Sequence, residues 1–361
     1  MNFLIFATLI LILFCTDVSS FKRTSQEECS VCRCHNVTAD CSNRNLSKVP
    51  VLRSNITRIF LSRNNFTTVT RNLFVNVKTL NITTIQLDYC NIKHVSTDTF
   101  ADFQWLTHLN ISGNKELSVQ ELSAALVKTQ LTELNLDDAG IEYMFVVVSP
   151  LRSIKTLSLK TNFIEKFNTS VLLNGFPSLR SLDLTNNRLE TFPFTANLSQ
   201  IEILNLTDNR IESGRLMFCL NGSDPSNKLK ILNLSWNYLS NISVFKSEGH
   251  CLSHLERLIL SNNYHIFKVP NNVFSRLPKI RNIRLKYVSE RTDIEPLAFN
   301  VSTLIELHLT TNEQLNLQPK HINMFKLTPN LQTLHFTNVI FKNIADNLTD
   351  MFSHLVHYER F

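Results

Sequence analysis

Glycine is scarce in this sequence. Its 361 residues include only six glycines, so glycine-rich phosphate-binding loops have little material from which to form. The His-Glu-x-x-His, Gly-x-Ser-x-Gly and Walker motifs are also missing, and the eleven histidines are scattered. The composition, 43% hydrophobic and 18% charged, is typical of a folded globular protein. These features favour a protein that binds over an enzyme, and they predict no cofactor and no metal site.

Long apolar runs are missing beyond the amino terminus. No later segment has 18 consecutive apolar residues, so we expect no membrane span there. The largely apolar run from Phe3 to Phe14 is too short to span a bilayer, and Asp17 and the small residues Val18 and Ser20 follow it. We therefore predict a signal peptide over residues 1–20. A signal anchor is the alternative, because no lysine or arginine precedes the run.

The cysteines indicate an oxidising compartment. Cys15 lies in the leader, and Cys29, Cys32, Cys34 and Cys41 form a tight cluster. Such a cluster would suggest zinc in the cytosol, but behind a signal peptide it predicts two disulfides. Fourteen Asn-x-Ser/Thr sequons point to the same compartment and predict a glycoprotein. The predicted glycosylation sites are Asn36, Asn45, Asn55, Asn65, Asn81, Asn110, Asn168, Asn197, Asn205, Asn221, Asn233, Asn241, Asn300 and Asn347.

One pattern recurs along the chain: apolar-x-x-apolar-x-apolar-x-x-Asn-x-apolar. Its clearest copies begin at Leu179 and Leu229, and the steps between copies run from 22 to 28 residues. This is the leucine-rich-repeat pattern, in which each unit forms a short strand that only stacked neighbours can cover. The twelve copies begin at Ile56, Ile82, Leu106, Leu131, Ile154, Leu179, Ile201, Leu229, Leu255, Ile280, Leu304 and Leu331.

The fold class we predict is an α/β leucine-rich-repeat solenoid, or horseshoe. Short parallel strands line its concave face, irregular or short helical segments form its convex face, and a disulfide cap closes its amino-terminal end. The predicted domains are a signal peptide (1–20), a cysteine cap (21–50) and repeats (51–361). The final repeat is incomplete and no carboxy-terminal cysteine cap follows it, so we expect a fragment of a longer protein. An end covered by a partner is the alternative.

The Asn position of the repeat should carry a buried ladder of side chains that form hydrogen bonds with neighbouring turns. We expect Cys90 to be a ladder member rather than a reactive thiol, and irregular structure where Ala139, Val288 and Val339 break the ladder. The full ladder reads Asn64, Cys90, Asn114, Ala139, Asn162, Asn187, Asn209, Asn237, Asn263, Val288, Asn312 and Val339.

Two further features concern the outer segments. Six phenylalanines precede successive strands and should form a core spine; they are Phe74, Phe100, Phe176, Phe274, Phe299 and Phe325. The long step between Ile201 and Leu229 contains Cys219, and Cys251 falls at the corresponding place one repeat later. Because adjacent turns stack closely, we predict a Cys219–Cys251 disulfide.

The cysteine cap followed by these repeats resembles the extracellular leucine-rich-repeat family, and most of all a Toll-like receptor ectodomain, over roughly residues 29–361. Similar caps occur on matrix proteoglycans, axon-guidance proteins and variable lymphocyte receptors. The resemblance implies the pairings Cys29–Cys34 and Cys32–Cys41 in the cap. It also implies use as a homodimer or heterodimer. Toll-like receptors have a membrane span and a signalling domain that this chain lacks, which puts signalling by the chain itself in doubt.

In each strand, the residue between the last two apolar positions should face the concave surface. Asn110, Asn205 and Asn233 are sequons in this row, so their glycans would keep large partners away from the central concavity. The whole row reads Phe60, Gln86, Asn110, Asn135, Ser158, Asp183, Asn205, Asn233, Ile259, Arg284, His308 and His335.

Beyond Asn233 the predicted face becomes basic and aromatic. We treat Trp236, Arg257, Ile259, Arg284, Lys286 and Tyr287 as a candidate ligand-binding patch, for which an ordinary mixed surface is the alternative. His308 and His335 should lie on adjacent strands, where they would act as an acid-triggered switch, bind an acidic ligand, or simply be two solvated histidines.

We therefore predict a non-enzymatic, ligand-binding protein that is secreted or sits on the extracellular face of the plasma membrane as part of a single-pass receptor. A Toll-like innate immune receptor ectodomain, or a soluble fragment of one, is the first interpretation, with a protein or microbial ligand. A matrix or cell-adhesion protein is the alternative. The formal charge of +6 leaves room for acidic partners, and a nucleic-acid ligand is a subsidiary hypothesis.

Overall fold

A computed structural model describes residues 29, 31–143, 146–166, 168–193, 200–219, 228–289, 292–341 and 351. The chain divides into two compact units. Unit 1 holds Met1–Ala139 and Val147–Ser149, and unit 2 holds Gly140–Val146 and Pro150–Phe361. The predicted signal peptide (1–20) and three predicted glycosylation sites, Asn197, Asn221 and Asn347, lie outside the described residues.

Unit 1 begins with the cysteine cap. Strands β1 (Arg33–His35) and β2 (Thr38–Asp40) form an antiparallel hairpin, and β2 then pairs in parallel with the first repeat strand. The disulfides Cys29–Cys34 and Cys32–Cys41 close the cap, as the resemblance implied. The parallel strands that follow are β3 (Arg58–Phe60), β5 (Thr84–Gln86), β7 (His108–Asn110) and β8 (Glu133–Asn135).

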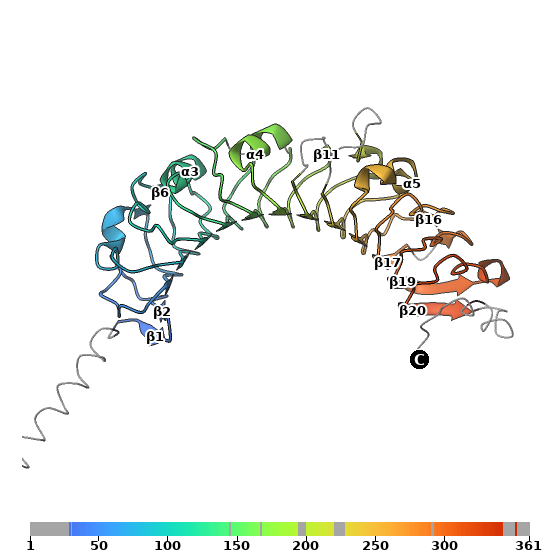
Figure 1. The fold of residues 1–361 in the computed structure, drawn as a ribbon, viewed down its shortest axis with the longest axis horizontal. Coiled ribbons are helices and arrows are strands. Elements are labelled where there is room, and N and C mark those ends of the chain that lie inside the picture. Colours follow the sequence, from blue (N-terminus) through green and yellow to red (C-terminus); the bar gives the residue numbers. More distant parts are fainter. Residues whose placement is uncertain are drawn as a thin grey trace, which may run out of the picture. The chain divides into compact units, whose positions relative to one another are not determined.

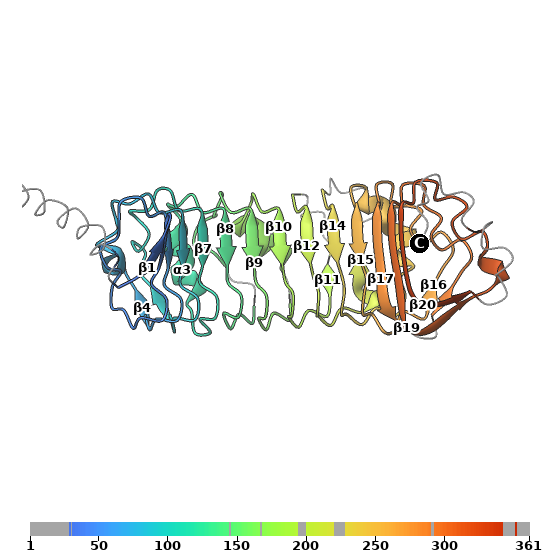
Figure 2. The ribbon, with the colours of Figure 1, turned by 90° about the horizontal axis from the view of Figure 1, so that it is seen from below.

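Unit 2 continues the same architecture. Its strands run in parallel, each hydrogen-bonded to the next, and line the inner side of the unit in Figure 1. Figure 2 shows them side by side in chain order. They are β9 (Thr156–Ser158), β10 (Ser181–Asp183), β12 (Ile203–Asn205), β14 (Ile231–Asn233), β15 (Arg257–Ile259), β17 (Asn282–Val288), β19 (Glu306–Leu317) and β20 (Thr333–Phe341).

Alternation within each strand builds the core. In each three-residue strand of the repeats, from β3 to β15, the middle residue is buried, while its two neighbours face outward. The apolar residue that follows each of these strands is also buried, as Leu184 and Leu234 illustrate. One turn alone could not cover these side chains, so the stacked turns share a single interior.

The predicted ladder is present. Asn237 is 4% exposed; its amide donates to the Leu206 and Leu234 carbonyls, and its carbonyl accepts from the Ile211 amide. Asn64, Asn114, Asn187, Asn209 and Asn263 repeat this pattern on their own turns. Cys90 is the predicted ladder member: it is fully buried, and burial raises the pKa of its thiol to about 11.

Strand length changes where the ladder breaks. β17, β19 and β20 span 7, 12 and 9 residues, whereas β9 to β15 span three each. The register shifts between Lys286 and Val288, and again between Thr310 and Leu315. The irregularity predicted at Val288 and Val339 is therefore confirmed. The third break in the ladder, Ala139, coincides with a boundary between the two units.

The outer side of each unit carries short elements (Figure 1), and the phenylalanine spine packs beneath them. All six predicted phenylalanines are buried, and the spine of unit 2 also includes Phe218 and Phe245. The outer elements of unit 1 are β4 (Thr68–Val69), η1 (Arg71–Phe74), β6 (His94–Val95) and α3 (Val119–Leu126). Those of unit 2 are α4 (Thr169–Gly175), β11 (Phe192–Pro193), η3 (Ser213–Arg215), β13 (Leu216–Met217), α5 (Val244–Glu248), η4 (Gly249–Leu252), β16 (Lys268–Val269), β18 (Asp293–Ile294) and η5 (Pro319–His321).

A membrane span was sought across the described part of the chain. None of the helices there has both the length and the apolar character needed to cross a bilayer.

Candidate functional site

The concave face of unit 2 has the row predicted from the sequence. Each row residue pairs with the next across adjacent parallel strands, from Ser158 on β9 to His335 on β20. Every turn presents three outward positions to this face: the row residue and the residues two before and two after it. These positions form a grid, which we divide at the boundary between β14 and β15.

The first half of the grid, β9 to β14, has no net charge. Its only charges are Lys160 and Asp183, which form an ion pair 3.4 Å apart. Its row holds the predicted glycosylation sites Asn205 and Asn233. Both side-chain carbonyls accept from the backbone amide two residues on, so both amides are held at fixed places on the face.

The second half of the grid, β15 to β20, is different. It carries the cations Arg257, Arg284 and Lys286 and the single anion Glu306, a formal charge of +2 with both histidines neutral. It holds no sequon. The structure thus brings together four of the six residues of the candidate patch, Arg257, Ile259, Arg284 and Lys286, with the histidine pair His308 and His335.

Glu306 is the centre of a polar cluster in this second half. Its carboxylate accepts from the Asn282 amide and from Nε2 of His308, and Arg284 Nη2 donates to it across 3.3 Å. Asn282 is 5% exposed, and the His308 side chain is 10% exposed. Two strands, β17 and β19, thereby supply a partly buried anion with three hydrogen-bond donors.

The charges of the cluster shift its pKa values. Burial, the largest influence, acts to raise the pKa of Glu306, but His308 and Arg284 together outweigh it, and the pKa lies below its usual value. Burial lowers the pKa of His308; His335 and Lys286 add to that effect, and Glu306 only partly offsets it. At neutral pH Glu306 is therefore charged and His308 is neutral.

The two histidines of the patch stack face to face. The ring centroids of His308 and His335 are 4.2 Å apart and the ring planes differ by 16°. His335 is exposed, but His308 is buried, so the interpretation of two solvated histidines is wrong for His308. Its position between Glu306 and the His335 ring excludes water from most of its surface.

A shallow cavity of about 200 Å³ opens beside the cluster, where the strands begin. Arg257 and Arg281 line it, and neither has an ion pair with any described residue. The remaining lining residues are Ile231, Glu256, Asn282, Ile305 and Glu306. A ligand on the second half of the grid could therefore reach the edge of the Glu306 cluster.

Two patch residues do not belong to the grid. Trp236 and Tyr287 occupy the left-handed turn position that follows the grid on their own repeats, with φ of 55° and 54°. Trp236 packs edge-on against Tyr264, with ring centroids 5.8 Å apart. Both side chains are exposed, and so are four that sequence reasoning missed: Tyr238, Tyr264, His265 and Phe267.

Asn282 and Glu306 were also missed, because the sequence interpretation followed only the middle row. Both stand two residues before that row, at the first position of their strands. Most turns carry a polar residue at this position, so neither residue stands out from its neighbours in the sequence. Reading all three outward positions would have placed both on the face.

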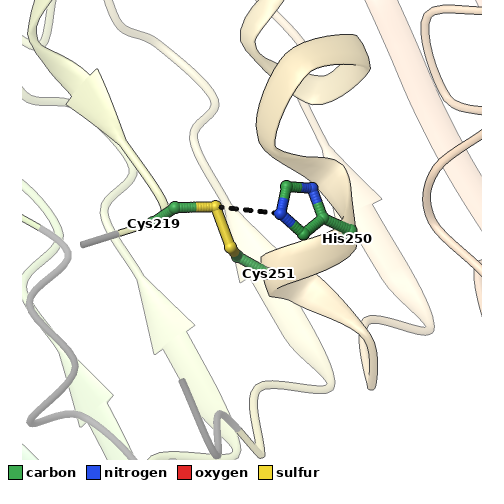
Figure 3. Close-up of side chains that lie close together, drawn as sticks. All are labelled: Cys219, His250 and Cys251. Carbon is green, nitrogen blue, oxygen red and sulfur yellow. Dashed lines mark hydrogen bonds between the residues drawn. A yellow bond between two sulfur atoms is a disulfide. The ribbon is translucent and has the colours of Figure 1, made fainter. Parts of the chain in front are cut away.

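A second cluster of chemically capable side chains lies on the outer side of unit 2. Cys219, His250 and Cys251 have ligand atoms within 4.8 Å of one another (Figure 3). The predicted Cys219–Cys251 disulfide is present, however, and it ties the segment after β13 to η4. Because both sulfurs are in the disulfide, they are not available as thiolate ligands, and the group is a structural link rather than a metal centre.

Comparison with known proteins bears on the fold. A sequence model of the family described as Leucine Rich Repeat matches residues 178–198, the turn that contains β10. Among solved structures, the chain is similar to one described as a TLR13–ssRNA13 complex. The TM-score is 0.61 and the identity 21%, over 84% of this chain and 42% of that one.

The chain has the fold of a leucine-rich-repeat solenoid. It is similar to osteomodulin of Bos taurus, with 26% identity over 331 residues, which cover 88% of this chain and 61% of osteomodulin. It is also similar to Toll-like receptor 3 of Boselaphus tragocamelus, with 26% identity over 293 residues, 73% of this chain and 30% of the receptor. The repeat protein thus spans about three-fifths of osteomodulin and less than a third of the receptor.

Proposed function

We propose that this leucine-rich-repeat protein is extracellular, acts by binding and not by catalysis, and holds its ligand on the second half of the concave grid in unit 2. The proposal is supported by the uneven distribution of charge and sequons over that face. The first half has no net charge and two sequons, and the second half has a charge of +2 and none. A glycan on Asn205 or Asn233 would shield the first half and leave β15 to β20 open.

A Toll-like receptor ectodomain, or a soluble form of one, is the specific function that we propose. The resemblance of cap and repeats to that group, the similarity to Toll-like receptor 3 and the shared fold with the TLR13–ssRNA13 complex support it. In this proposal, the ligand is a microbial or protein molecule that carries acidic groups, because the open half of the grid is cationic. Its partner in signalling is a second solenoid, in a homodimer or heterodimer.

A matrix or cell-adhesion protein is the second candidate. The similarity to osteomodulin favours it, because that similarity covers more of this chain than the similarity to Toll-like receptor 3 does. The transcript beyond Phe361 discriminates the two candidates. A membrane span and a cytoplasmic signalling domain would support the receptor, whereas recovery of the secreted protein from extracellular matrix would support the second candidate.

A glycan placed on the open half tests the binding face. Ile259→Asn completes an Asn-x-Ser sequon with Ser261, in the same row as Asn205 and Asn233. We expect the glycosylated variant to lose binding of the anionic probes heparin and single-stranded RNA, measured by surface plasmon resonance. Mass spectrometry would verify that the new site is occupied.

The control uses the other half of the same row. Asp183→Asn completes a sequon with Thr185 on β10, and we expect it to bind the probes as the wild type does. Ile259→Asn combined with Ser261→Ala makes the same row substitution without a sequon and should also bind. Equal loss in both glycosylated variants, or no binding of either probe by the wild type, would overturn the proposal.

A further inference from the structure

Buried polar atoms that lack a hydrogen-bond partner gather at one place. Within the described residues four side-chain nitrogen or oxygen atoms are of this kind, and three belong to the Glu306 cluster: Asn282 Oδ1, Arg284 Nε and His308 Nδ1. A buried polar group without a partner costs roughly 1–3 kcal/mol. Three on one small patch indicate a site whose hydrogen bonding is incomplete in the unliganded protein.

The guanidinium group of Arg284 has an incomplete set of hydrogen bonds. A guanidinium group has an Nε–Nη2 edge that fits the two oxygens of a carboxylate or phosphate with parallel hydrogen bonds. In unit 1, Arg71 uses that edge fully on Asp102, with Nε and Nη2 at 2.7 and 2.5 Å from the two oxygens. Arg284 contacts Glu306 only through Nη2, and its Nε has no partner. One of the two donors on this Nε–Nη2 edge, which we call the fork, is therefore unused.

Glu306 cannot complete the fork because its two oxygens are shared. One oxygen accepts from the Asn282 amide, and the other serves both His308 and Arg284. The side chain of Arg284 is 35% exposed and that of Glu306 is 27% exposed, so solvent reaches part of each, although Arg284 Nε itself is buried behind the ion pair. Glu306 is also the only anion of the second half of the grid, among three cations.

We propose that Glu306 is a built-in substitute for an acidic ligand group, and that a ligand oxyanion displaces it from Arg284. The ligand group is a carboxylate, sulfate or phosphate with two oxygens to pair with the Nε–Nη2 edge. Lys286, which stands two residues along β17 from Arg284, adds positive charge beside the incoming group. Glu306 retains its bonds to Asn282 and His308 and gives up only the 3.3 Å contact. The exchange of ion pairs needs no proton transfer.

This inference rests on the proposed function, because it names the chemistry by which the open half of the grid takes its ligand. In this proposal, the Glu306 carboxylate weakens the binding of an external oxyanion to the unliganded protein. Since the carboxylate of Glu306 is tethered beside Arg284, an external oxyanion must compete with it at a high effective concentration. Removal of the Glu306 charge should therefore strengthen binding.

Calorimetric titration of the secreted chain with sodium sulfate, phosphate and acetate at constant ionic strength tests the proposal. We expect the wild type to bind these ions weakly and Glu306→Gln to bind at least one of them about tenfold tighter, which is about 1.4 kcal/mol. The ion with the largest gain identifies the acidic group that the site prefers. Glu306→Asp keeps the charge but shortens the side chain, and it should show a smaller gain.

Two controls distinguish pairing with the Arg284 fork from the general electrostatic effect of a change in net charge. Glu256→Gln makes the same change of net charge at the edge of the neighbouring cavity and should give no gain. Arg284→Lys, combined with Glu306→Gln, keeps the cation but removes the planar fork and should return the affinity to the wild-type level. An equal gain in Glu256→Gln, a gain that survives Arg284→Lys, or no gain in Glu306→Gln and Glu306→Asp would overturn the proposal.

The outcome is distinguishable from failure of the proposed function. If the glycan at position 259 blocks heparin and RNA while Glu306→Gln shows no gain for any oxyanion, the face binds ligand but Glu306 does not compete for the site. If the glycan has no effect while Glu306→Gln gains affinity, the anion site exists but is not the site of ligand capture.

Discussion

Each ladder asparagine supplies hydrogen bonds that its own turn and the preceding one cannot make for themselves. The tight turn after each strand leaves carbonyl and amide groups inside the stack, away from water. An asparagine amide has two donors and a carbonyl, which is the right set to bond both turns at once. Cys90 replaces it with one weak donor, whose Sγ lies 3.2 Å from the Leu61 carbonyl.

Removal of one ladder side chain should therefore destabilise the stack. Asn237→Ala leaves the Ile211 amide buried without a partner and removes one of the two donors to the Leu206 carbonyl, which keeps Asn209, and we expect a loss of roughly 1–3 kcal/mol. Asn174→Ala, at an exposed site in α4, should stay within about 0.5 kcal/mol of the wild type. Urea denaturation followed by circular dichroism measures both. Equal midpoints for the two variants would contradict the role of the ladder.

The Glu306 cluster should make stability depend on pH. The pKa of His308 is lowered by burial in the folded chain, so the unfolded chain binds the proton more readily. The stabilising contribution is present above the ordinary histidine pKa of 6.5 and is lost as the pH falls below it. His335 and Lys286 oppose protonation of His308, and Glu306 favours it.

We expect the thermal midpoint of the wild type to fall as the pH is lowered below about 6.5, and His308→Gln to flatten that fall. His254→Gln, at an exposed site beyond η4, is the matched control and should keep the wild-type slope. Scanning calorimetry between neutral and mildly acidic pH gives the comparison. A His308→Gln profile parallel to that of the wild type would show that His308 does not set the dependence.

At the scale of elements, two side chains decide where a strand ends. On β10, β12 and β14, an Asp or Asn in the row accepts from the backbone amide two residues later and turns the chain off the strand. The ladder asparagine then holds the turn. β17 has Arg284 in the row and Val288 in the ladder, so neither device is present and the strand runs on to seven residues.

Sequence alone was sufficient for the repeat, the ladder and the middle row, because each follows from a strict period and an alternation of faces. The lengthened strands were foreseen only as irregularity, since the register shifts depend on how long neighbouring strands pair. The Glu306 cluster was not predicted. Its bonds join side chains from two turns, and no local pattern in either turn marks them. The tilted contact between the rings of Tyr238 and His265 likewise joins two turns and has no local signal in either.

The Cys219–Cys251 disulfide should stabilise the packing between outer elements of unit 2. It links the segment after β13 to η4 across a separation of 32 residues. The chain-entropy argument gives about 3–4 kcal/mol for a loop of that length. We expect the double variant Cys219→Ala, Cys251→Ala to unfold at a lower urea concentration by a corresponding amount. Asn174→Ala, at its exposed site in α4, retains all three disulfides and serves as the comparison. A double variant as stable as the wild type would show that packing alone holds this segment.

At the scale of the whole molecule, the concave positions differ in charge from one group of strands to the next. In unit 1 the grid positions of β3 to β8 carry Arg58 against Asp88, Glu133 and Asp137, a formal charge of −2. In unit 2 the charge is zero over β9 to β14 and +2 over β15 to β20. An acidic ligand would therefore be attracted to one end of unit 2 and repelled by unit 1.

Hydrogen–deuterium exchange of the glycosylated chain, with and without heparin, tests this most directly. We predict slower exchange on binding in peptides that cover 257–261, 282–288 and 306–310, and unchanged exchange in those that cover 156–160 and 181–185. Protection confined to the first half of the grid, to unit 1 or to the outer elements would contradict the assignment of β15 to β20 as the ligand face.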